Sequence, residues 1–541
     1  MKVFLLIFLF LNLNLSFYQQ LYYFQLKNYF KLRYFYFIIK NKQFFINLII
    51  VLSIFILYIL KLTNFIYYLI LIIFNFYYFL FNLCLILKKK KIKFKLTAKI
   101  LRLVSYFDIS IILSITIYFI IKKTITLNLL TFLVLIPSIN FLSVILLATL
   151  DLYGYIESLI WKIKAIKKIK SNPKIIKIGI TGSNGKTSVK NILHEFLSLK
   201  YNTVKTPKNF NTPKGIIYTI NKLVTNETDC IIFEMGARKR KDIFQLCKIS
   251  KPDIGIITNI APQHMQTFKT IETVVSTKKE LSDYLNNKLC IYNLNNSYCN
   301  TIFNSKKGEK ISVKIFEYKA LIKNKSLKSS YNSTKCRAVL SKEIFKINLP
   351  DLYAKNIHIN NLKYRFELVY QFRRHLAETS LLGKHNITNI LLATMLALKL
   401  NIEIDDIIKK ISELQPTEHR LQLIKGRINI LDDSYNCSIE SAKCAIEVLS
   451  KFKGEKVVCT PGIIEGGKEQ ANLNIALAKM LKDANSINII VGKTNKEYFK
   501  KVLSNDKTFY VDNLEQAKSH FNKLKSDSTL LLLNDLPDDY N

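Results

Sequence analysis

The chain has 541 residues and a formal net charge of +41, from 80 Lys and Arg against 39 Asp and Glu. Heavy use of Lys, Asn and Ile beside only 15 Gly and 10 Pro points to codon bias in an AT-rich genome, and no RNA- or DNA-binding motif accompanies the charge, so no nucleic-acid partner is expected. The length predicts roughly three domains, and nine cysteines without a C-x-x-C pair argue against a disulfide framework or a structural zinc site.

Residues 1–150 are mostly apolar and are predicted to form a membrane region. About 20 apolar residues of helix cross a bilayer core, a length that 64–87 meets, whereas 3–17 and 107–121 are short enough to be interfacial. No small-x-small site follows the first stretch, which favours an uncleaved anchor over a signal peptide. The five candidate spans are 3–17, 43–60, 64–87, 107–121 and 125–149.

Basic residues predict the orientation of these spans. Segments 18–42, 88–106 and 161–170 are rich in Lys and Arg, whereas the alternate loops together hold three lysines. Because cytoplasmic loops carry the excess of positive charge, five spans with the N-terminus outside place the large C-terminal part in the cytoplasm. Residues 151–173 are a basic juxtamembrane linker, in which 161–173 is expected as a solvated helix or coil near anionic membrane lipid.

From residue 174 onward, short apolar runs alternate with helical patterns. This alternation is typical of α/β domains, in which a parallel sheet is covered on both faces. We expect one α/β domain at 174–405, with a β-rich excursion at 303–380, and a second, Rossmann-like domain at 410–541. The runs that predict buried strands are KIIKIGI (174–180), CIIFEM (230–235), IGIITNI (254–260), INILDD (428–433), KVVCT (456–460), INIIVG (487–492) and TLLLLN (529–534).

The motif TGSNGKT (181–187) lies between the first run and a helical pattern at 188–200. The general phosphate-loop pattern G-x-x-x-x-G-K-[ST] is only half present, because Ile180 occupies the place of the first Gly. The strand–loop–helix context still favours an ATP-binding loop over an ordinary turn, with Lys186 neutralising phosphate oxygens and Thr187 holding Mg²⁺. The predicted phosphate-binding residues are Gly182, Ser183, Asn184, Gly185, Lys186, Thr187 and Ser188.

Two other strand ends carry polar residues. Ligands of open α/β sheets bind beyond the carboxyl ends of the strands. Glu234 follows the apolar run CIIF and is a candidate magnesium carboxylate, with a surface Glu as the alternative. His264 follows the next strand in NIAPQHMQ, where a metal role is preferred over a structural histidine.

These motifs together resemble those of the Mur ligase family, the ATP-dependent ligases that build the peptide stem of peptidoglycan. TGSNGKT is similar to the family's own phosphate loop, including the missing first Gly. The best match is the MurF-type branch, which adds D-alanyl-D-alanine, and two further motifs look like a membrane-anchored subgroup of it. The motifs are KNFNTPKG (208–215), EMGA (234–237), TNIAPQH (258–264), TKKEL (277–281), LGKHNITN (382–389), DDSYN (432–436) and, for the subgroup, CTPGIIEGG (459–467) and NDLPDDY (534–540).

The resemblance implies a fold, a reaction and a place in the cell. The fold is an α-helical membrane region followed by α/β: a P-loop Mur ligase central domain and a Rossmann-like C-terminal ligase domain. The reaction consumes ATP with Mg²⁺, activates a muramoyl-peptide carboxylate as an acyl phosphate and joins it to D-alanyl-D-alanine. The location is the bacterial cytoplasmic membrane, multi-pass, with the catalytic domains in the cytoplasm.

The resemblance also implies roles for single residues. Thr187 and Glu234 serve one Mg²⁺, and His264 serves a second together with Lys278, which matches the family's carbamylated lysine. Lys279 leaves that register open by one residue, and a solvated lysine is the alternative. The other implied contacts are Asn386 and Asn389 to adenine (or as helix caps), Arg420 and Asp433 to the nucleotide, and Asn209, Asn211 and Asn436 to substrate.

Two departures keep alternatives open. Ser438-Ile439 replaces the family's usual Asn-Pro. The apolar stretches run almost directly into the phosphate-loop domain, where the soluble relatives carry a UDP-sugar-binding domain. The acceptor is therefore either UDP-linked or lipid-linked, and an ATP-driven transporter is a third, less favoured reading.

Overall fold

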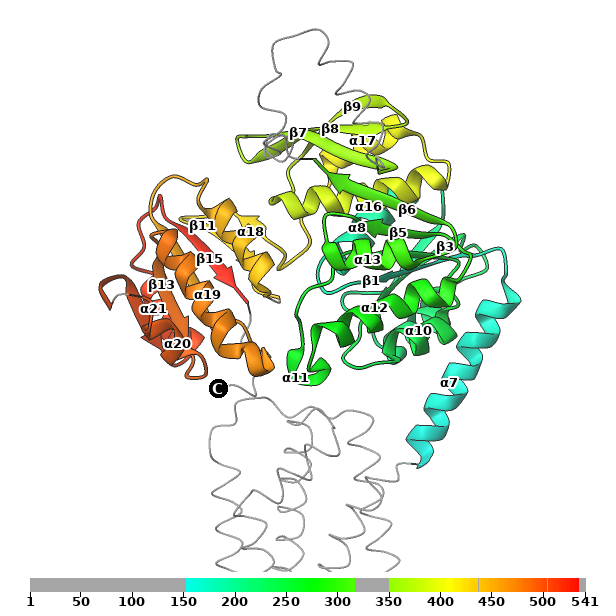
Figure 1. Cartoon of the computed structure of the whole chain (residues 1–541), viewed down its shortest axis with the longest axis horizontal. Helices are drawn as coiled ribbons and strands as arrows, with labels where there is room; N and C mark the ends of the chain where they lie inside the picture. Colours follow the sequence, from blue (N-terminus) through cyan, green and yellow to red (C-terminus); the bar gives the residue numbers. More distant parts are fainter. Residues whose placement is uncertain (1–151, 317–349, 436, 465, 504, 535–541) are drawn as a thin grey trace, which may run out of the picture. The chain divides into compact units, whose positions relative to one another are not determined.

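The computed structural model describes residues 152–316, 350–435, 437–464, 466–503 and 505–534 (Figure 1). The five candidate spans and Asn436 lie outside these ranges. Within them, no helix is both long and apolar enough to cross a membrane. The chain divides into two compact units, Met1–Ile160 and Trp161–Asn541, and the two sheets described below belong to the second.

The first sheet has nine strands in the order β2-β3-β1-β4-β5-β6-β7-β8-β9. Strands β2 to β7 pair in parallel, and β7, β8 and β9 form an antiparallel meander at one edge. The β-rich excursion is thus a continuation of this sheet. The strands are β1 (Ile176–Thr181), β2 (Thr203–Lys205), β3 (Cys230–Met235), β4 (Ile254–Ile257), β5 (Cys290–Asn293), β6 (Lys310–Ile315), β7 (Leu352–Asn360), β8 (Lys363–Tyr370) and β9 (Arg373–Thr379).

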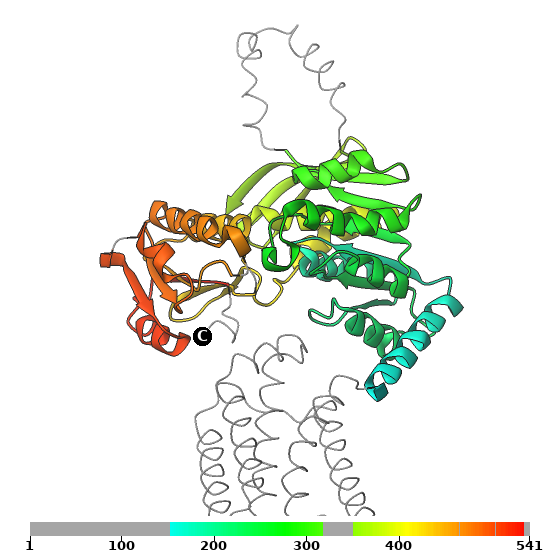
Figure 2. The ribbon, with the colours of Figure 1, turned by 60° about the horizontal axis from the view of Figure 1, so that its bottom comes forward.

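Helices cover both faces of the first sheet (Figure 1, Figure 2). Successive side chains of a strand point to opposite faces, so Ile232 of β3 joins one core with α8 and α16, whereas Ile231 and Phe233 join another with α10 and α12. This confirms the predicted covering of a parallel sheet. The helices are α8 (Lys186–Leu197), α9 (Pro213–Tyr218), α10 (Asp242–Ser250), α11 (Met265–Phe268), α12 (Ile271–Leu285), α13 (Ser297–Ser305), α16 (Lys384–Lys399) and α17 (Ile404–Glu413).

The second sheet has six strands in the order β10-β11-β15-β12-β13-β14, parallel except for the β10–β11 pair. Helices α18 and α19 pack on one face and α21 on the other. Its elements are β10 (Gln422–Ile424), β11 (Asn429–Asp433), α18 (Ile439–Leu449), β12 (Lys456–Thr460), α19 (Gln470–Asp483), β13 (Ile487–Val491), α20 (Lys496–Lys500), β14 (Thr508–Val511), α21 (Leu514–Phe521) and β15 (Thr529–Leu533). The first sheet with its helices is called the central lobe, and the second sheet with its helices the C-terminal lobe.

The N-termini of α12 and α18 matter for the candidate site, because α12 carries Lys278 and the cap of α18 is Ser438. Thr270 caps α12, its hydroxyl accepting from the backbone N–H of Thr273 at 3.3 Å. Ser438 caps α18 in a capping box with Ser441. Side-chain caps of this kind satisfy backbone donors that a helix leaves unpaired.

The basic linker forms helix α7 (Leu152–Ser171). It is less solvated than expected, because Ala165 and Ile169 are buried in the core that holds α10 and α12. Lys168 Nζ donates to the carbonyl of Val224 at 2.6 Å. The helical alternative for this segment is therefore confirmed, with one face packed.

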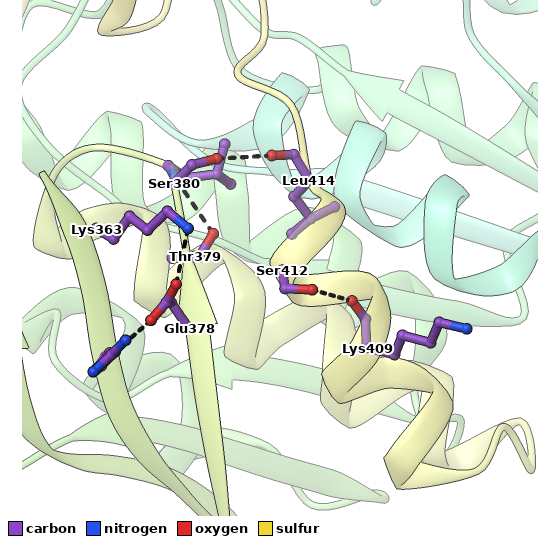
Figure 3. A network of polar contacts seen from close by, with 9 residues as sticks. Lys363, Glu378, Thr379, Ser380, Lys409, Ser412 and Leu414 are labelled. Atoms are coloured by element: carbon purple, nitrogen blue, oxygen red, sulfur yellow. Dashed lines mark hydrogen bonds and ion pairs between the residues drawn. The ribbon is translucent and has the colours of Figure 1, made fainter. Parts of the chain in front are cut away.

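Polar contacts tie the meander to α17 (Figure 3). Glu378 on β9 accepts from Lys363 at 3.0 Å and from Arg365, both on β8. Ser380, just after β9, donates to the carbonyl of Leu414 at 3.2 Å. The meander is thereby held next to the segment that leads into the C-terminal lobe.

Candidate active site

The phosphate loop connects β1 to α8, with glycines at its two tight points. Gly182 has a φ of 155°, and a Cβ there would lie 2.1 Å from Thr258 Oγ1. Gly185 has a φ of 83°, and a Cβ there would lie 2.7 Å from Asn389 Oδ1. Only glycine fits these positions without strain, so the loop backbone can approach a ligand closely.

Hydrogen bonds fix the loop against the end of β4. Ser183 donates from its backbone N–H to Asn259 O at 2.6 Å and from its hydroxyl to Ala261 O at 2.9 Å. Thr258 Oγ1 donates to Asn184 O at 2.6 Å. Thr187 and Ser188 lie in the first turn of α8, a helix N-terminus that favours anions.

Lys186 folds back over the loop. Its Nζ donates to the carbonyls of Gly182 and Ser183, both at 2.6 Å. Burial lowers the pKa of Lys186 to about 8, with Arg420 lowering it further and Glu234 opposing the shift. The ammonium therefore sits where a phosphate would outcompete two neutral carbonyls.

Glu234 is the buried carboxylate of the site, with 1% exposure at the end of β3, so the surface alternative is wrong. Oε1 accepts from Asn211 Nδ2 at 3.1 Å. Oε2 lies 3.1 Å from Lys190 Nζ but accepts no well-formed hydrogen bond. The described residues hold no cluster of three or more His, Cys, Asp or Glu, and Mg²⁺ is usually held through one or two carboxylates with phosphates and waters. A carboxylate oxygen with free lone pairs beside a phosphate loop fits that ion.

The two adjacent lysines of α12, Lys278 and Lys279, differ in how much of each side chain is exposed to solvent. Lys278 is 3% exposed, on the face shared with Val274 and Leu281. Burial, then the charge of Lys186, holds the pKa of Lys278 well below its ordinary value, against Asp242 and Glu280. Lys279 is half-exposed, and its Nζ lies 3.7 Å from Asp283 Oδ1. The solvated alternative is therefore wrong for Lys278.

His264 lies at the start of α11 with a left-handed backbone, φ 53°. Its carbonyl accepts from the backbone N–H groups of Thr267 and Phe268 at 2.9 and 3.1 Å. These bonds explain the position of its backbone. Its role toward a metal stays a prediction.

Asn386 and Asn389 are buried on α16, next to the phosphate loop. Asn386 Nδ2 donates to Leu382 O at 2.7 Å, and Asn389 Nδ2 donates to Asn386 Oδ1 at 3.0 Å. The helix begins after Gly383 without a side-chain cap, so the capping alternative is wrong. The amide pair is positioned by its own hydrogen bonds.

Arg420 and Asp433 come from the other lobe. The Arg420 guanidinium lies 4.0 Å from the ring centroid of Tyr435, a cation–π contact. Asp433 Oδ1 accepts from the N–H of Leu421 at 3.2 Å. Burial raises the pKa of Asp433 to about 6, while Arg420 lowers it. Arg420, Lys186 and Glu234 are close enough to influence one another electrostatically, which brings residues of both lobes to one site.

The two predicted substrate asparagines of the β2–α9 loop have protein partners. Asn211 contacts Glu234, as described above, and Asn209 Nδ2 donates to Tyr435 Oη at 2.8 Å. Ser438, which replaces the expected Asn, accepts from Asn184 Nδ2 at 3.0 Å. Sequence reasoning missed Lys190 and this Ser438 contact. A lysine on the apolar face of α8, four residues after Lys186, was the available signal.

Gly185→Ala is expected to weaken ATP binding at least about tenfold, since alanine meets both a left-handed backbone and Asn389. Titration with a fluorescent ATP analogue measures this. Gly426→Ala is the matched control, because the nearest atom to its Cβ is 3.6 Å away. Equal affinity in the two variants would contradict the assignment of the loop.

Residues 180–397 match the family described as the Mur ligase middle domain. The chain is similar to the UDP-N-acetylmuramoyl-tripeptide--D-alanyl-D-alanine ligase of Buchnera aphidicola, 29% identical over 66% of this chain and 71% of the relative. It is similar to the Escherichia coli ligase of that name, 28% identical over 58% and 64%, and to that of Borreliella burgdorferi, 31% over 49% and 50%. The chain thus spans between 50% and 71% of the length of these relatives.

Solved structures show the same fold. MurF from Acinetobacter baumannii aligns with a TM-score of 0.59 at 21% identity, over 70% of this chain and 77% of that one. MurF ligase from Thermotoga maritima in complex with ADP aligns with a TM-score of 0.58 at 20% identity, over 70% and 80%. Both alignments support the α/β fold described above.

Proposed function

This chain belongs to the Mur ligase family, and on that premise we propose that it is an ATP-dependent ligase that adds D-alanyl-D-alanine to the muramoyl-peptide precursor of peptidoglycan. The observation that carries the proposal is the convergence of the phosphate loop with buried Glu234 and with Arg420 of the other lobe. Relatives named UDP-N-acetylmuramoyl-tripeptide--D-alanyl-D-alanine ligase align with this chain over 362 and 324 residues, which supports the proposal.

The reaction proceeds in two steps. The acceptor carboxylate attacks the γ-phosphorus of ATP, forming an acyl phosphate and releasing ADP. The amine of D-alanyl-D-alanine then attacks the acyl carbon, and collapse of the tetrahedral intermediate expels phosphate as the nitrogen loses a proton. Lys186 and the loop N–H groups hold the phosphates, and closure of the lobes excludes the water that would hydrolyse the acyl phosphate.

Four residues are proposed to hold Mg²⁺. Thr187 and Glu234 serve one ion, and His264 and a carbamylated Lys278 serve a second. When bound, Mg²⁺ would neutralise the oxygens of phosphate and carboxylate, which otherwise repel each other. Low exposure of Lys278 and its lowered pKa support carbamylation, because only the neutral amine reacts with CO₂.

Nucleotide binding is proposed to use both lobes. Asn386 and Asn389 face adenine, and Arg420 with Asp433 holds phosphate and ribose, for which a planar guanidinium fork and a carboxylate are suited. The cation–π contact with Tyr435 supports this by orienting Arg420. Asn436, which lies outside the described residues, stays a predicted contact of the incoming amino compound.

The affinity for ADP is expected to fall as the pH drops through about 6, since protonation of Asp433, whose pKa burial raises to about 6, removes an acceptor for ribose hydroxyls. Binding is thus complete above this pH and lost below it. Asp433→Asn is expected to bind weakly with no inflection near pH 6. Titration with fluorescent ADP between pH 5 and 8 measures the affinity of wild type and of the variant. An inflection near pH 6 that persists in Asp433→Asn would show that a group other than Asp433 causes it.

The location and the acceptor are proposed from the apolar N-terminal part. Five candidate spans in 1–150 and the basic segments that flank them support a multi-pass protein of the bacterial cytoplasmic membrane with its catalytic lobes in the cytoplasm. Such a protein could take either the UDP-linked or a lipid-linked precursor. The presence of apolar stretches where soluble relatives bind the nucleotide sugar favours testing both.

The proposed function is tested with the full-length protein in detergent, with Mg²⁺-ATP and D-alanyl-D-alanine. Mass spectrometry follows product on the UDP-linked muramoyl tripeptide and on its lipid-linked counterpart in parallel. ADP release that depends on both acceptor and amine is expected. ATP hydrolysis that needs neither would instead support the transporter reading.

A further inference from the structure

Lys190 is a buried lysine that the proposed reaction leaves unused. It lies on α8 one turn after Lys186 and is 1% exposed. Its Nζ is 3.1 Å from Glu234 Oε2 and donates to the carbonyl of Lys208. Burying an ammonium group costs free energy unless the group is paired with an opposite charge and hydrogen-bonded. These two contacts therefore stabilise the buried position of Lys190.

The contacts of Glu234 divide between its two oxygens. Oε1 is engaged by the amide of Asn211, whereas Oε2 faces the charge of Lys190 without a well-formed hydrogen bond. The backbone N–H of Glu234 is fixed separately, by Thr206 Oγ1 at 3.0 Å. Oε2 is therefore the oxygen with lone pairs available to a cation, and Lys190 is the cation that now neutralises it.

The same lysine anchors a loop. Residues 206–211 contribute Thr206 and Asn211 to Glu234, and Lys208 has a left-handed backbone with φ 42°. A non-glycine residue in that conformation is held by its surroundings, and the carbonyl of Lys208 bonds to Lys190. Lys190 thus contributes both to the position of the loop and to the charge next to Glu234.

We propose that Lys190 is a positioning residue: it is the resident counter-ion of Glu234 that a divalent cation displaces from Oε2, and its displacement releases the 206–211 loop. This rests on the proposed Mg²⁺ site at Glu234. The ligand class is a hard divalent cation, because the displaced partner leaves a carboxylate oxygen. Lys190 opposes metal binding by like-charge repulsion while it holds the loop in place.

The proposed displacement by a metal ion is tested by measuring the affinity of the full-length protein for Mn²⁺ in the presence of ADP. Electron paramagnetic resonance distinguishes free from bound Mn²⁺. Lys190→Met is expected to bind Mn²⁺ at least about tenfold tighter than wild type, because a unit charge a few Å from the metal is removed. Lys190→Arg retains the wild-type value, and so does the control Lys214→Met, whose lysine is exposed beside the same loop. Equal or weaker Mn²⁺ binding by Lys190→Met overturns the proposal.

The loop part is tested by hydrogen exchange of residues 206–211. Mn²⁺-ADP is expected to raise exchange there in wild type, and Lys190→Met is expected to show the raised level without metal. Lys190→Gln removes the charge but keeps a hydrogen-bond donor for the carbonyl of Lys208. This variant should therefore bind Mn²⁺ tightly while residues 206–211 stay protected from exchange. It replaces Lys190→Met in the test if that variant fails to fold. Unchanged loop exchange in every state overturns the coupling. Failure of wild type to bind Mn²⁺-ADP would instead refute the proposed function.

Discussion

Lys278→Met is expected to lower ligation turnover by about 10³-fold, the size of effect seen when a group that stabilises developing charge is removed. Lys279→Met, one residue along the same helix, is expected to leave turnover near wild type. The contrast follows from position, since Lys278 is buried beside the charge of Lys186 whereas Lys279 is half-exposed and faces Asp283. Steady-state ADP release by the two variants measures the difference.

Carbamylation of Lys278 can be measured directly, which tests the role of this residue independently of turnover. The lowered pKa of Lys278 supplies neutral amine, whose nitrogen attacks CO₂, forming an N–C bond and releasing a proton to give a carbamate anion. ¹³C-labelled bicarbonate should therefore produce a carbamate resonance in wild type and in Lys279→Met that is missing in Lys278→Met. Full activity of Lys278→Met, or a carbamate signal that persists in it, would show that Lys278 is a structural lysine.

Glu234→Gln is expected to lower turnover by about 10³-fold or more, since a neutral amide replaces the carboxylate that neutralises a metal beside the phosphates. Glutamine keeps the shape and an acceptor for Asn211. Glu234→Ala is a poorer test of chemistry, because it strands the ammonium of Lys190 in a buried site, a loss of about 3–5 kcal/mol when a buried ion pair is broken from one side.

Activity and stability are therefore measured together on these variants. Thermal unfolding should place Glu234→Gln nearer wild type than Glu234→Ala, and Glu234→Ala combined with Lys190→Met should recover part of the stability. Retained turnover in well-folded Glu234→Gln would remove this residue from the metal site.

Much of the fold could be predicted because parallel strands such as β3 and β12 are buried on both faces, whereas β8 begins with alternating exposed and buried residues. The apolar runs at 230–235 and 456–460 coincide with β3 and β12, and 363–370 coincides with β8. Strand ends were less certain: β4 ends at Ile257, three residues before the run does, since Thr258 already turns to bond the phosphate loop. Local apolar pattern predicts that a strand exists, and tertiary contacts decide where it ends.

The residues of the candidate site also differ in how well the sequence predicts them. The phosphate loop and Glu234 carry local signals, a motif and a charged residue after an apolar run. Lys278 was separable from Lys279, because Val274, Leu281 and Leu285 define a helical face on which only Lys278 falls. The partners of Asn211 and Ser438 had no such signal, since they belong to elements far apart in sequence and exist only once the sheet and the lobes have formed.

The hydrogen bonds between the lobes share one chemistry. Three of them join an asparagine amide on the central side to a hydroxyl on the other side: Asn184 to Ser438, Asn191 to Thr417 and Asn209 to Tyr435. In a chain of net charge +41, these three bonds join neutral groups, although charged Arg420 of the C-terminal lobe lies near Lys186 and Glu234. Neutral bonds of this kind exchange readily with water at a net cost of only about 1 kcal/mol each, and salt does not screen them. These three bonds are thus suited to repeated breaking and re-forming, as one cycle of product departure and substrate entry per turnover requires, and their own strength should be the same in dilute and in concentrated salt.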